Sequence, residues 1–319
     1  MATHDYVIAN GTGSAVRADL NNALAAIVSQ NSNSSEPATK YAYQIWVDTT
    51  ANKIKLRNSA NNAWLEVGTT TGGVLSVTDA LINAITVGRG AGDVATNTVV
   101  GNNALDANTS GSSNTAIGDE VLTANTTGAR NSAVGYQALQ TNTTGNYNAA
   151  VGSNYCLGRN TTGSYNAALG DGALANNTTA NFNVAVGQSA LHLNTTGANN
   201  SALGYLALRS NTTVTQNTAS GMQALYTNTT GSYNTATGYN ALYLSTTGSY
   251  NTATGRISLA SNTTGANNTA HGYAALFSNT TGTQNTATGD KALYSNTTGN
   301  YNTASGYQTL YSNTTASTT

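Results

Sequence analysis

Apolar and polar positions along most of this chain recur every 17 residues, a spacing far longer than the ~3.6-residue period of an amphipathic helix. Each unit has Asn, Ala, Gly and Leu at fixed positions, as in Asn234-Thr-Ala-Thr-Gly-Tyr-Asn-Ala-Leu242. Successive units are 17 residues apart, except that Gly152 and Gly170 are separated by 18. The glycines that mark the register are Gly101, Gly118, Gly135, Gly152, Gly170, Gly187, Gly204, Gly221, Gly238, Gly255, Gly272, Gly289 and Gly306.

Short stacked strands account for this period better than helices do. A helical hairpin repeat needs about 33 residues or more, and Asn, Thr and Gly are poor helix formers. We therefore predict a mainly β fold in which residues 97–319 form a parallel β-solenoid or β-roll of 17-residue coils. Identical residues would then lie above one another in columns, and a column of Asn can form a hydrogen-bonded ladder. Two successive coils illustrate the predicted stacking columns: Asn234, Ala236, Gly238, Leu242, Asn251, Ala253, Gly255 and Leu259.

The apolar content of each coil is small, which bears on the oligomeric state. Burial of one Leu contributes about 1.5–3 kcal/mol, whereas ordering costs about 1 kcal/mol or more per residue. A 17-residue coil is therefore expected to close with difficulty alone. Because Ala columns would let backbones approach a shared axis, we predict that chains associate, and the geometry together with the resemblance given below favours a homotrimer. The position before the marker Gly is aliphatic from Val100 to Leu203 and becomes Ser, Thr or His from Ser220 onward.

The N-terminal part of the chain is not repetitive. Apolar residues at helical spacing predict a helix within residues 14–28, with Ser14 as its N-cap. Residues 1–68 are predicted to form a small α+β module, with Trp46 or Trp64 against that helix, and residues 69–96 a neck that opens on Thr-Thr-Thr-Gly-Gly. A three-stranded meander is predicted from the β-branched segments Tyr43–Thr49, Lys53–Arg57 and Ala63–Val67.

Composition excludes several classes of partner. Charged residues make up 7% of the chain and the formal net charge is −1, so no basic stripe is present for nucleic acid. No run approaches the ~20 apolar residues of a transmembrane helix, and no basic-then-apolar signal opens the chain. We therefore expect neither nucleic-acid binding nor membrane insertion. Cys156 is the only cysteine and stands where most units have Ala, which predicts a small core residue.

Candidate catalytic chemistry is sparse. The array contains two of the three histidines, His192 and His271, in different columns of distant units. The twelve carboxylates form no recurring pair suited to acid–base work. The Asn-x-Thr sequences keep a fixed place in the repeat, which predicts turns rather than glycan acceptors. We therefore expect no enzymatic activity, no metal and no cofactor.

Tyrosine is the surface residue with most functional promise. It recurs after the marker Gly, after the Leu and before the Asn of many units. The rings could stack and shield the coil, or their faces could pack on sugar rings; the pattern leaves both interpretations open. If recognition is the function, it is expected beyond Ser220. The candidate receptor-facing residues are Tyr226, Tyr243, Tyr294 and Tyr311.

Several segments resemble known families. Asn131-Ser-Ala-Val-Gly-Tyr-Gln-Ala-Leu139 resembles the head repeats of trimeric autotransporter adhesins, which form left-handed parallel β-rolls around a common axis. Residues 80–90, leading into Asn-Thr-Thr-Gly units, are similar to phage tail fibres. Residues 4–48 resemble the N-terminal part of virion structural proteins of marine bacteriophages.

These resemblances imply a phage tail-fibre or virion structural protein located on the extracellular particle. The N-terminal module would dock on other virion proteins, and the trimeric array would project toward host cell-surface polysaccharide. Two rival functions are weighed beside this one. Paired threonines such as Thr235 and Thr237 suggest an ice-binding solenoid, and a polysaccharide depolymerase is the third possibility.

Overall fold

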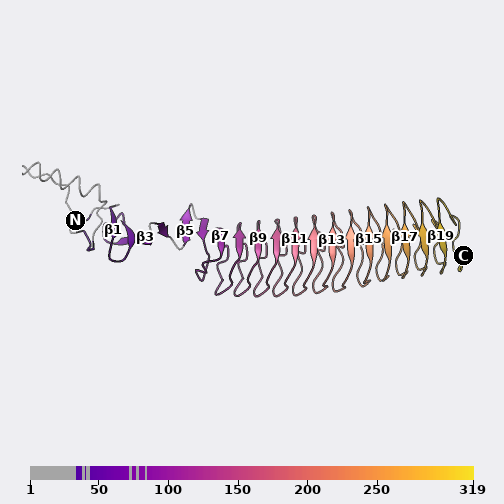
Figure 1. Ribbon diagram of the computed structural model, residues 1–319, viewed down its shortest axis with the longest axis horizontal. Coiled ribbons are helices and arrows are strands. Elements are labelled where there is room, and N and C mark those ends of the chain that lie inside the picture. The colour runs from indigo at the N-terminus through magenta and orange to yellow at the C-terminus, as the bar shows by residue number, and fades with distance from the viewer. Residues whose placement is uncertain (1–33, 38–39, 41–43, 72–73, 77–78, 83–84) are drawn as a thin grey trace, which may run out of the picture. The chain divides into compact units, whose positions relative to one another are not determined.

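The computed structural model describes residues 34–37, 40, 44–71, 74–76, 79–82 and 85–319. These residues are almost entirely β and belong to two compact units, which divide between Ala80 and Leu81 (Figure 1). The helix predicted within residues 14–28 lies outside the described residues.

The N-terminal unit contains a four-stranded antiparallel sheet. Its strands, in sheet order, are β1 (Ile45–Asp48), β2 (Lys53–Arg57), β3 (Trp64–Thr71) and β4 (Val74–Ser76). The predicted meander is confirmed and gains one strand, because β3 continues through Thr69–Thr71 and pairs with β4. Threonine is β-branched and favours strands, so the triple-Thr segment extends the sheet past residue 68, where the module was predicted to end.

Two tryptophans form the apolar centre of this small sheet. Trp46 is buried, and its ring lies 5.4 Å from that of Trp64, between centroids, at an interplanar angle of 57°. The Lys55 ammonium lies 4.3 Å from the Trp46 ring centroid and forms an ion pair of 2.8 Å with Asp48. Because Lys55 donates to this carboxylate, the pKa of Asp48 is held below its ordinary value.

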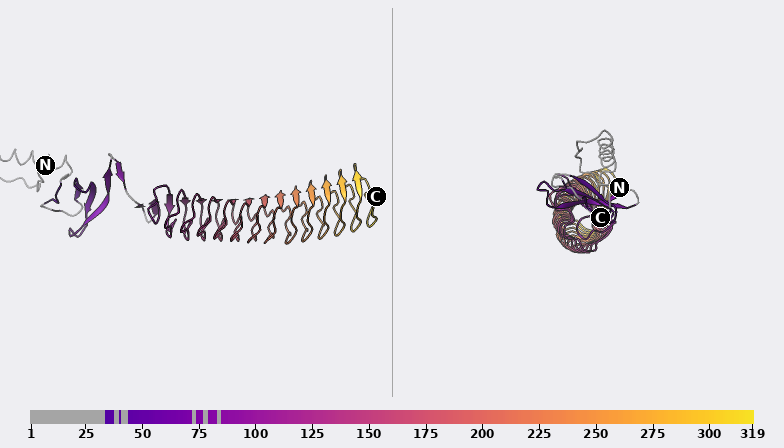
Figure 2. Two further views of the ribbon diagram at one scale, coloured as in Figure 1. Left: turned by 60° about the horizontal axis from the view of Figure 1, so that its bottom comes forward. Right: turned by 90° about the vertical axis from the view of Figure 1, so that its left-hand side faces the viewer.

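The second unit is a parallel β-solenoid, as predicted. Each coil contributes one short strand to a single sheet, and the coils superimpose when viewed along the axis (Figure 2). Two earlier strands, β5 (Asp79–Ile82) and β6 (Ile85–Gly88), begin this sheet, and β6 pairs with β7 antiparallel. The parallel strands are β7 (Thr98–Gly101), β8 (Thr115–Ile117), β9 (Ser132–Val134), β10 (Ala149–Val151), β11 (Ala167–Leu169), β12 (Val184–Val186), β13 (Ser201–Leu203), β14 (Thr218–Ser220), β15 (Thr235–Thr237), β16 (Thr252–Thr254), β17 (Thr269–His271), β18 (Thr286–Thr288) and β19 (Thr303–Ser305).

The register between strands places identical residues in columns. Ala236 on β15 pairs with Ala253 on β16, and both side chains point into the coil. The Leu column lies beside them, and Leu242 and Leu259 are 0% exposed. One chain therefore encloses its own core. The Ala column faces the inside of its own coil, so the expectation that it faces an axis shared between chains is wrong.

Two Asn ladders explain why so small a core suffices. In the first, Asn234 Nδ2 donates to the Gly248 carbonyl (2.8 Å), and its Oδ1 accepts the Asn251 backbone N–H (3.0 Å). The second ladder runs through the Asn-Thr-Thr-Gly turns, where Asn279 Nδ2 donates to Asn262 Oδ1 (2.8 Å). These amides satisfy buried backbone groups that would otherwise cost about 1–3 kcal/mol each. The Asn ladder predicted from the sequence is confirmed.

Each coil turns sharply by using left-handed backbone conformations. In the coil that begins at Asn234, Asn240, Leu242 and Tyr250 have φ values of 53°, 52° and 61°. A left-handed residue other than Gly costs about 1–2 kcal/mol. Full burial of the Leu side chain, at about 1.5–3 kcal/mol, offsets that cost at the Leu position.

Candidate functional site

The tyrosines singled out from the sequence form stacks along the coil axis. Tyr226 and Tyr243 have ring centroids 5.3 Å apart at 12°, and Tyr294 and Tyr311 have centroids 5.0 Å apart at 3°. Phe277 extends the second stack, with its ring 5.2 Å from that of Tyr294. The rings in each stack cover one another's faces, which matches the interpretation that the rings stack and shield the coil. A receptor-facing role for these residues stays a prediction.

A different column exposes its tyrosines individually. Tyr239 and Tyr273 are exposed, and the Arg256 guanidinium lies 5.6 Å from each ring centroid. Tyrosines in this column alternate with other residues, so they do not stack directly on one another. Cation–π contacts of this kind are worth about 0.5–1 kcal/mol at exposed positions.

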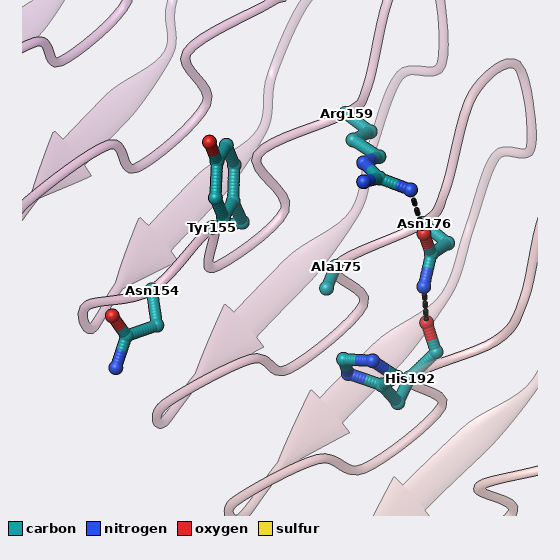
Figure 3. Close-up of a pocket in the computed structure, with 6 residues that line it drawn as sticks. All are labelled: Asn154, Tyr155, Arg159, Ala175, Asn176 and His192. Carbon is teal, nitrogen blue, oxygen red and sulfur yellow. Dashed lines mark hydrogen bonds between the residues drawn. The ribbon is translucent and has the colours of Figure 1, made fainter.

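A separate hollow opens where the repeat is irregular. Its volume is about 290 Å³, and Ala175 lies in the middle of the residues around it (Figure 3). Three successive coils contribute to the lining, which consists of Asn154, Tyr155, Arg159, Ala175, Asn176 and His192.

The single inserted residue of the array shapes one wall of the hollow. Asn154 and Tyr155 are both left-handed, with φ values of 48° and 62°, whereas a regular coil has one such residue at this place. The turn brings Tyr155 close to the following backbone: a Cβ on Gly158 would lie 2.6 Å from the Tyr155 Cα. Gly158 is therefore required by the insertion. The additional left-handed residue and the glycine at position 158 are therefore two parts of the same irregular turn.

A chain of hydrogen bonds fixes the opposite wall. Arg159 Nη1 donates to Asn176 Oδ1 (2.6 Å), and Asn176 Nδ2 donates to the His192 carbonyl (2.8 Å) (Figure 3). His192 Nδ1 lies 3.0 Å from the Gly172 carbonyl oxygen. A carbonyl can only accept, so Nδ1 donates the hydrogen bond. No hydrogen bond to His192 Nε2 is found among the described residues.

The charge of the hollow is set mainly by Arg159. Among the described residues, no acidic group forms an ion pair with this guanidinium, whose protein hydrogen bond is the one to Asn176. Asp171 carries a carboxylate at the wall formed by the insertion, where it accepts hydrogen bonds from Asn154 Nδ2 and Ser153 Oγ. Nε and Nη2 of Arg159 therefore remain available to a ligand.

Cys156 is adjacent in sequence to this wall but is not available for chemistry. Its side chain is buried, and the Sγ lies 3.6 Å from the Ala168 carbonyl oxygen. Burial raises the pKa of the Cys156 thiol from 9.0 to about 12. The thiolate needed for nucleophilic attack is therefore suppressed at neutral pH, in agreement with its predicted place in the core.

The sequence contained a sign of the hollow that did not lead to a predicted site. The 18-residue spacing marks the irregular coil, but sequence alone suggests only a tolerated insertion. Arg159 and His192 lie 33 positions apart and in different columns. They line the same hollow because Asn176, in the coil between theirs, accepts from Arg159 and donates to the His192 carbonyl. The hollow also precedes Ser220, whereas the sequence directed attention beyond that residue.

Other kinds of site are not found in the described part of the chain. Those residues contain no group of three or more His, Cys, Asp or Glu placed to hold a metal ion. No described helix is both long and apolar enough to cross a membrane. No protein-family model, curated protein or solved structure matches this chain.

Proposed function

We propose that this protein is a structural fibre of a bacteriophage particle, located on the virion, with a role in adsorption to host surface polysaccharide. The observation that carries the proposal is the uninterrupted in-register stacking of strands β7–β19. At about 4.8 Å per coil, thirteen strands span roughly 60 Å. Every coil is hydrogen-bonded to its neighbours, which makes the array a stiff spacer. The N-terminal unit would dock on other virion proteins.

Association into a homotrimer is part of the same proposal, and one outer face of the sheet supports it. The residues before the marker Gly point outward, and Leu169 and Leu203 are 50% and 54% exposed. Aliphatic residues fill this position in seven consecutive coils. Such continuous apolar stripes commonly mark interaction surfaces. We call these seven residues, from Val100 to Leu203, the aliphatic stripe. We expect identical chains to meet at this stripe and not at the buried Ala column.

Particle labelling tests the proposed location. Antibodies raised against residues 97–319 should bind fibres on intact phage in electron micrographs. The purified chain, added in excess, should slow phage adsorption to host cells by competing for the receptor. Particles that carry no label, together with adsorption unaffected by the free chain, would contradict the proposal.

Ice binding is a second candidate, favoured by one feature of the outer sheet face. Thr235 and Thr237 on β15 are both exposed while Ala236 between them is buried, and β18 repeats the arrangement with Thr286 and Thr288. Parallel columns of Thr on a regular sheet could match an ordered water lattice. Ser220, His271 and Ser305 interrupt the columns. Thermal hysteresis of a solution of the purified chain would support this function, and its absence at high protein concentration would reject it.

A further inference from the structure

We propose that the hollow lined by Arg159, Tyr155 and His192 binds a sugar ring that carries a carboxylate, such as a uronic acid. The source of that sugar, an acidic polysaccharide of the host surface, rests on the proposed adsorption function. The binding chemistry itself rests only on the hollow. The site is distinct from the tyrosine stacks.

The first argument is the unpaired cation. A carboxylate matches the planar guanidinium group and can accept two parallel hydrogen bonds from it. In this hollow Arg159 is held by one hydrogen bond through Nη1, while Nε and Nη2 have no protein partner among the described residues. Asn176, which holds the guanidinium, is itself oriented by its bond to the His192 carbonyl. The cation is therefore positioned in advance.

The second argument separates a sugar from a bare anion. The lining offers hydrogen-bonding groups besides the guanidinium: the Tyr155 hydroxyl, Asn154 Oδ1 and His192 Nε2, none of which has a partner among the residues that the structure describes. These groups include acceptors, to which sugar hydroxyls can donate but a sulfate ion, which has no hydroxyl, cannot. Ala175 lies between them, with 5% of its surface exposed. A polar lining of this kind suits a ring that carries several hydroxyls.

The third argument is size. Pockets for small molecules commonly range from about 300 to 1,000 Å³, and this hollow, at about 290 Å³, is at the lower end. That volume suits one ring with its carboxylate rather than a bound oligosaccharide. The rest of a polysaccharide chain would leave through the open side. Weak binding of single rings by many fibres can add up to firm attachment.

The Asp171 carboxylate would repel a ligand carboxylate, but its hydrogen bonds place it on one side of the hollow. Asp171 accepts hydrogen bonds from Ser153 and Asn154, on the side of the hollow that carries the insertion. Arg159 lies beyond the insertion and bonds to Asn176. We therefore place the ligand carboxylate at Arg159 and the ring hydroxyls toward Asn154 and Tyr155.

Calorimetric titration of the full chain with methyl α-D-galacturonoside tests the proposal. The acidic glycoside should bind, while the neutral methyl α-D-galactoside and inorganic phosphate should each bind at least about tenfold more weakly. Arg159→Gln should lower affinity for the acidic glycoside by about tenfold or more. Arg256→Gln removes an exposed arginine elsewhere in the array and should leave binding unchanged.

One further variant keeps the result interpretable. Deletion of Asn154 restores a 17-residue coil and should abolish binding, while an unchanged circular dichroism spectrum shows that the solenoid persists. Equal binding of phosphate and the glycoside would reduce the site to a general anion site and overturn the proposal. Absence of binding by the wild-type chain, or full binding by Arg159→Gln, would overturn it as well.

Adsorption assays distinguish this failure from failure of the proposed function. If the wild-type chain competes with phage for host cells and Arg159→Gln competes equally well, the fibre function stands and the hollow is not its receptor site. If the wild-type chain does not compete and particles are unlabelled, the fibre function fails. The calorimetric result for the acidic glycoside does not depend on the outcome of the adsorption or the labelling experiment.

Discussion

Residue 245 is the one place where the second Asn ladder is broken. Asn occupies this column in the neighbouring coils, but here the residue is Ser245. Its buried Oγ has no hydrogen-bond partner, and neither does Asn228 Oδ1 in the preceding coil. Asn262, in the following coil, keeps its bond to Gly265. A buried polar atom without a partner costs about 1–3 kcal/mol, so the gap is a local weakness.

Completion of the ladder should stabilise the protein. In Ser245→Asn, the new Nδ2 would donate to Asn228 Oδ1, and the new Oδ1 would accept from Asn262. We expect a gain of about 1–3 kcal/mol in the free energy of unfolding, measured by urea titration. The reverse change in an intact part of the ladder, Asn279→Ser, should cost a similar amount. A Ser245→Asn variant no more stable than the wild type would contradict this account.

Cys156 predicts a dependence of stability on alkaline pH. Its pKa is raised by burial from 9.0 to about 12, so the unfolded chain loses the thiol proton first. The stability associated with the protonated thiol is complete below about pH 9 and is lost as pH rises toward about 12.

A matched variant isolates this effect from the titration of tyrosine and lysine. Cys156→Ala places in this column the residue found at Ala138 and Ala173, both fully buried. The urea midpoint of the wild type should fall more than that of Cys156→Ala between about pH 8 and about pH 11. Parallel losses in the two proteins would show that the thiol does not contribute.

At the scale of the coil, the marker glycines permit the close approach of successive turns. Gly238 has φ 131°, and a Cβ placed on it would lie 2.6 Å from the Gly255 carbonyl oxygen. Both the backbone conformation and the contact therefore exclude a side chain. Gly172 is not a marker glycine but lies two residues after one, Gly170. Its φ is 63°, and the nearest atom to an added Cβ would be His192 Nδ1 at 3.3 Å.

This contrast gives a pair of substitutions with different expected costs. Gly238→Ala should lower the free energy of unfolding by about 2–5 kcal/mol, because strain and overpacking add. Gly172→Ala adopts a left-handed conformation that Asn and Leu already adopt in other coils, and should cost about 1–2 kcal/mol. Thermal or urea unfolding of both variants measures the difference. Equal costs would show that contact between coils does not set the glycine requirement.

The sequence predicted the elements because period and column identity are local properties. The Ala, Leu and Asn columns and the strands β1–β3 follow directly from which residues recur and which are β-branched. Self-closure of one chain did not follow, because the Asn ladders satisfy backbone groups in ways that counting apolar residues ignores. The left-handed Leu conformation was also missed, since Leu gives no signal for it. The hollow required knowing which columns lie side by side.

At the scale of the molecule, the aliphatic stripe makes the proposed association testable. Leu169→Asp and Leu203→Asp together should reduce the mass of the native oligomer, because charges placed on an apolar interface are desolvated at high cost. Thr237→Asp and Thr288→Asp change the same column in the polar half and should leave the mass unchanged. Native mass spectrometry measures both, and a monomeric wild-type chain would reject the homotrimer.

The in-register columns also have a consequence for how such a protein changes over generations. Each strand of the array pairs only with the strands before and after it, and most coils present the same Asn, Ala and Leu columns to both neighbours. Gain or loss of a whole 17-residue unit therefore leaves the remaining strands and side-chain columns in register. The chain can lengthen or shorten in steps of about 4.8 Å. Units gained or lost beyond β13 would change the length of the array and leave the hollow at Arg159 intact.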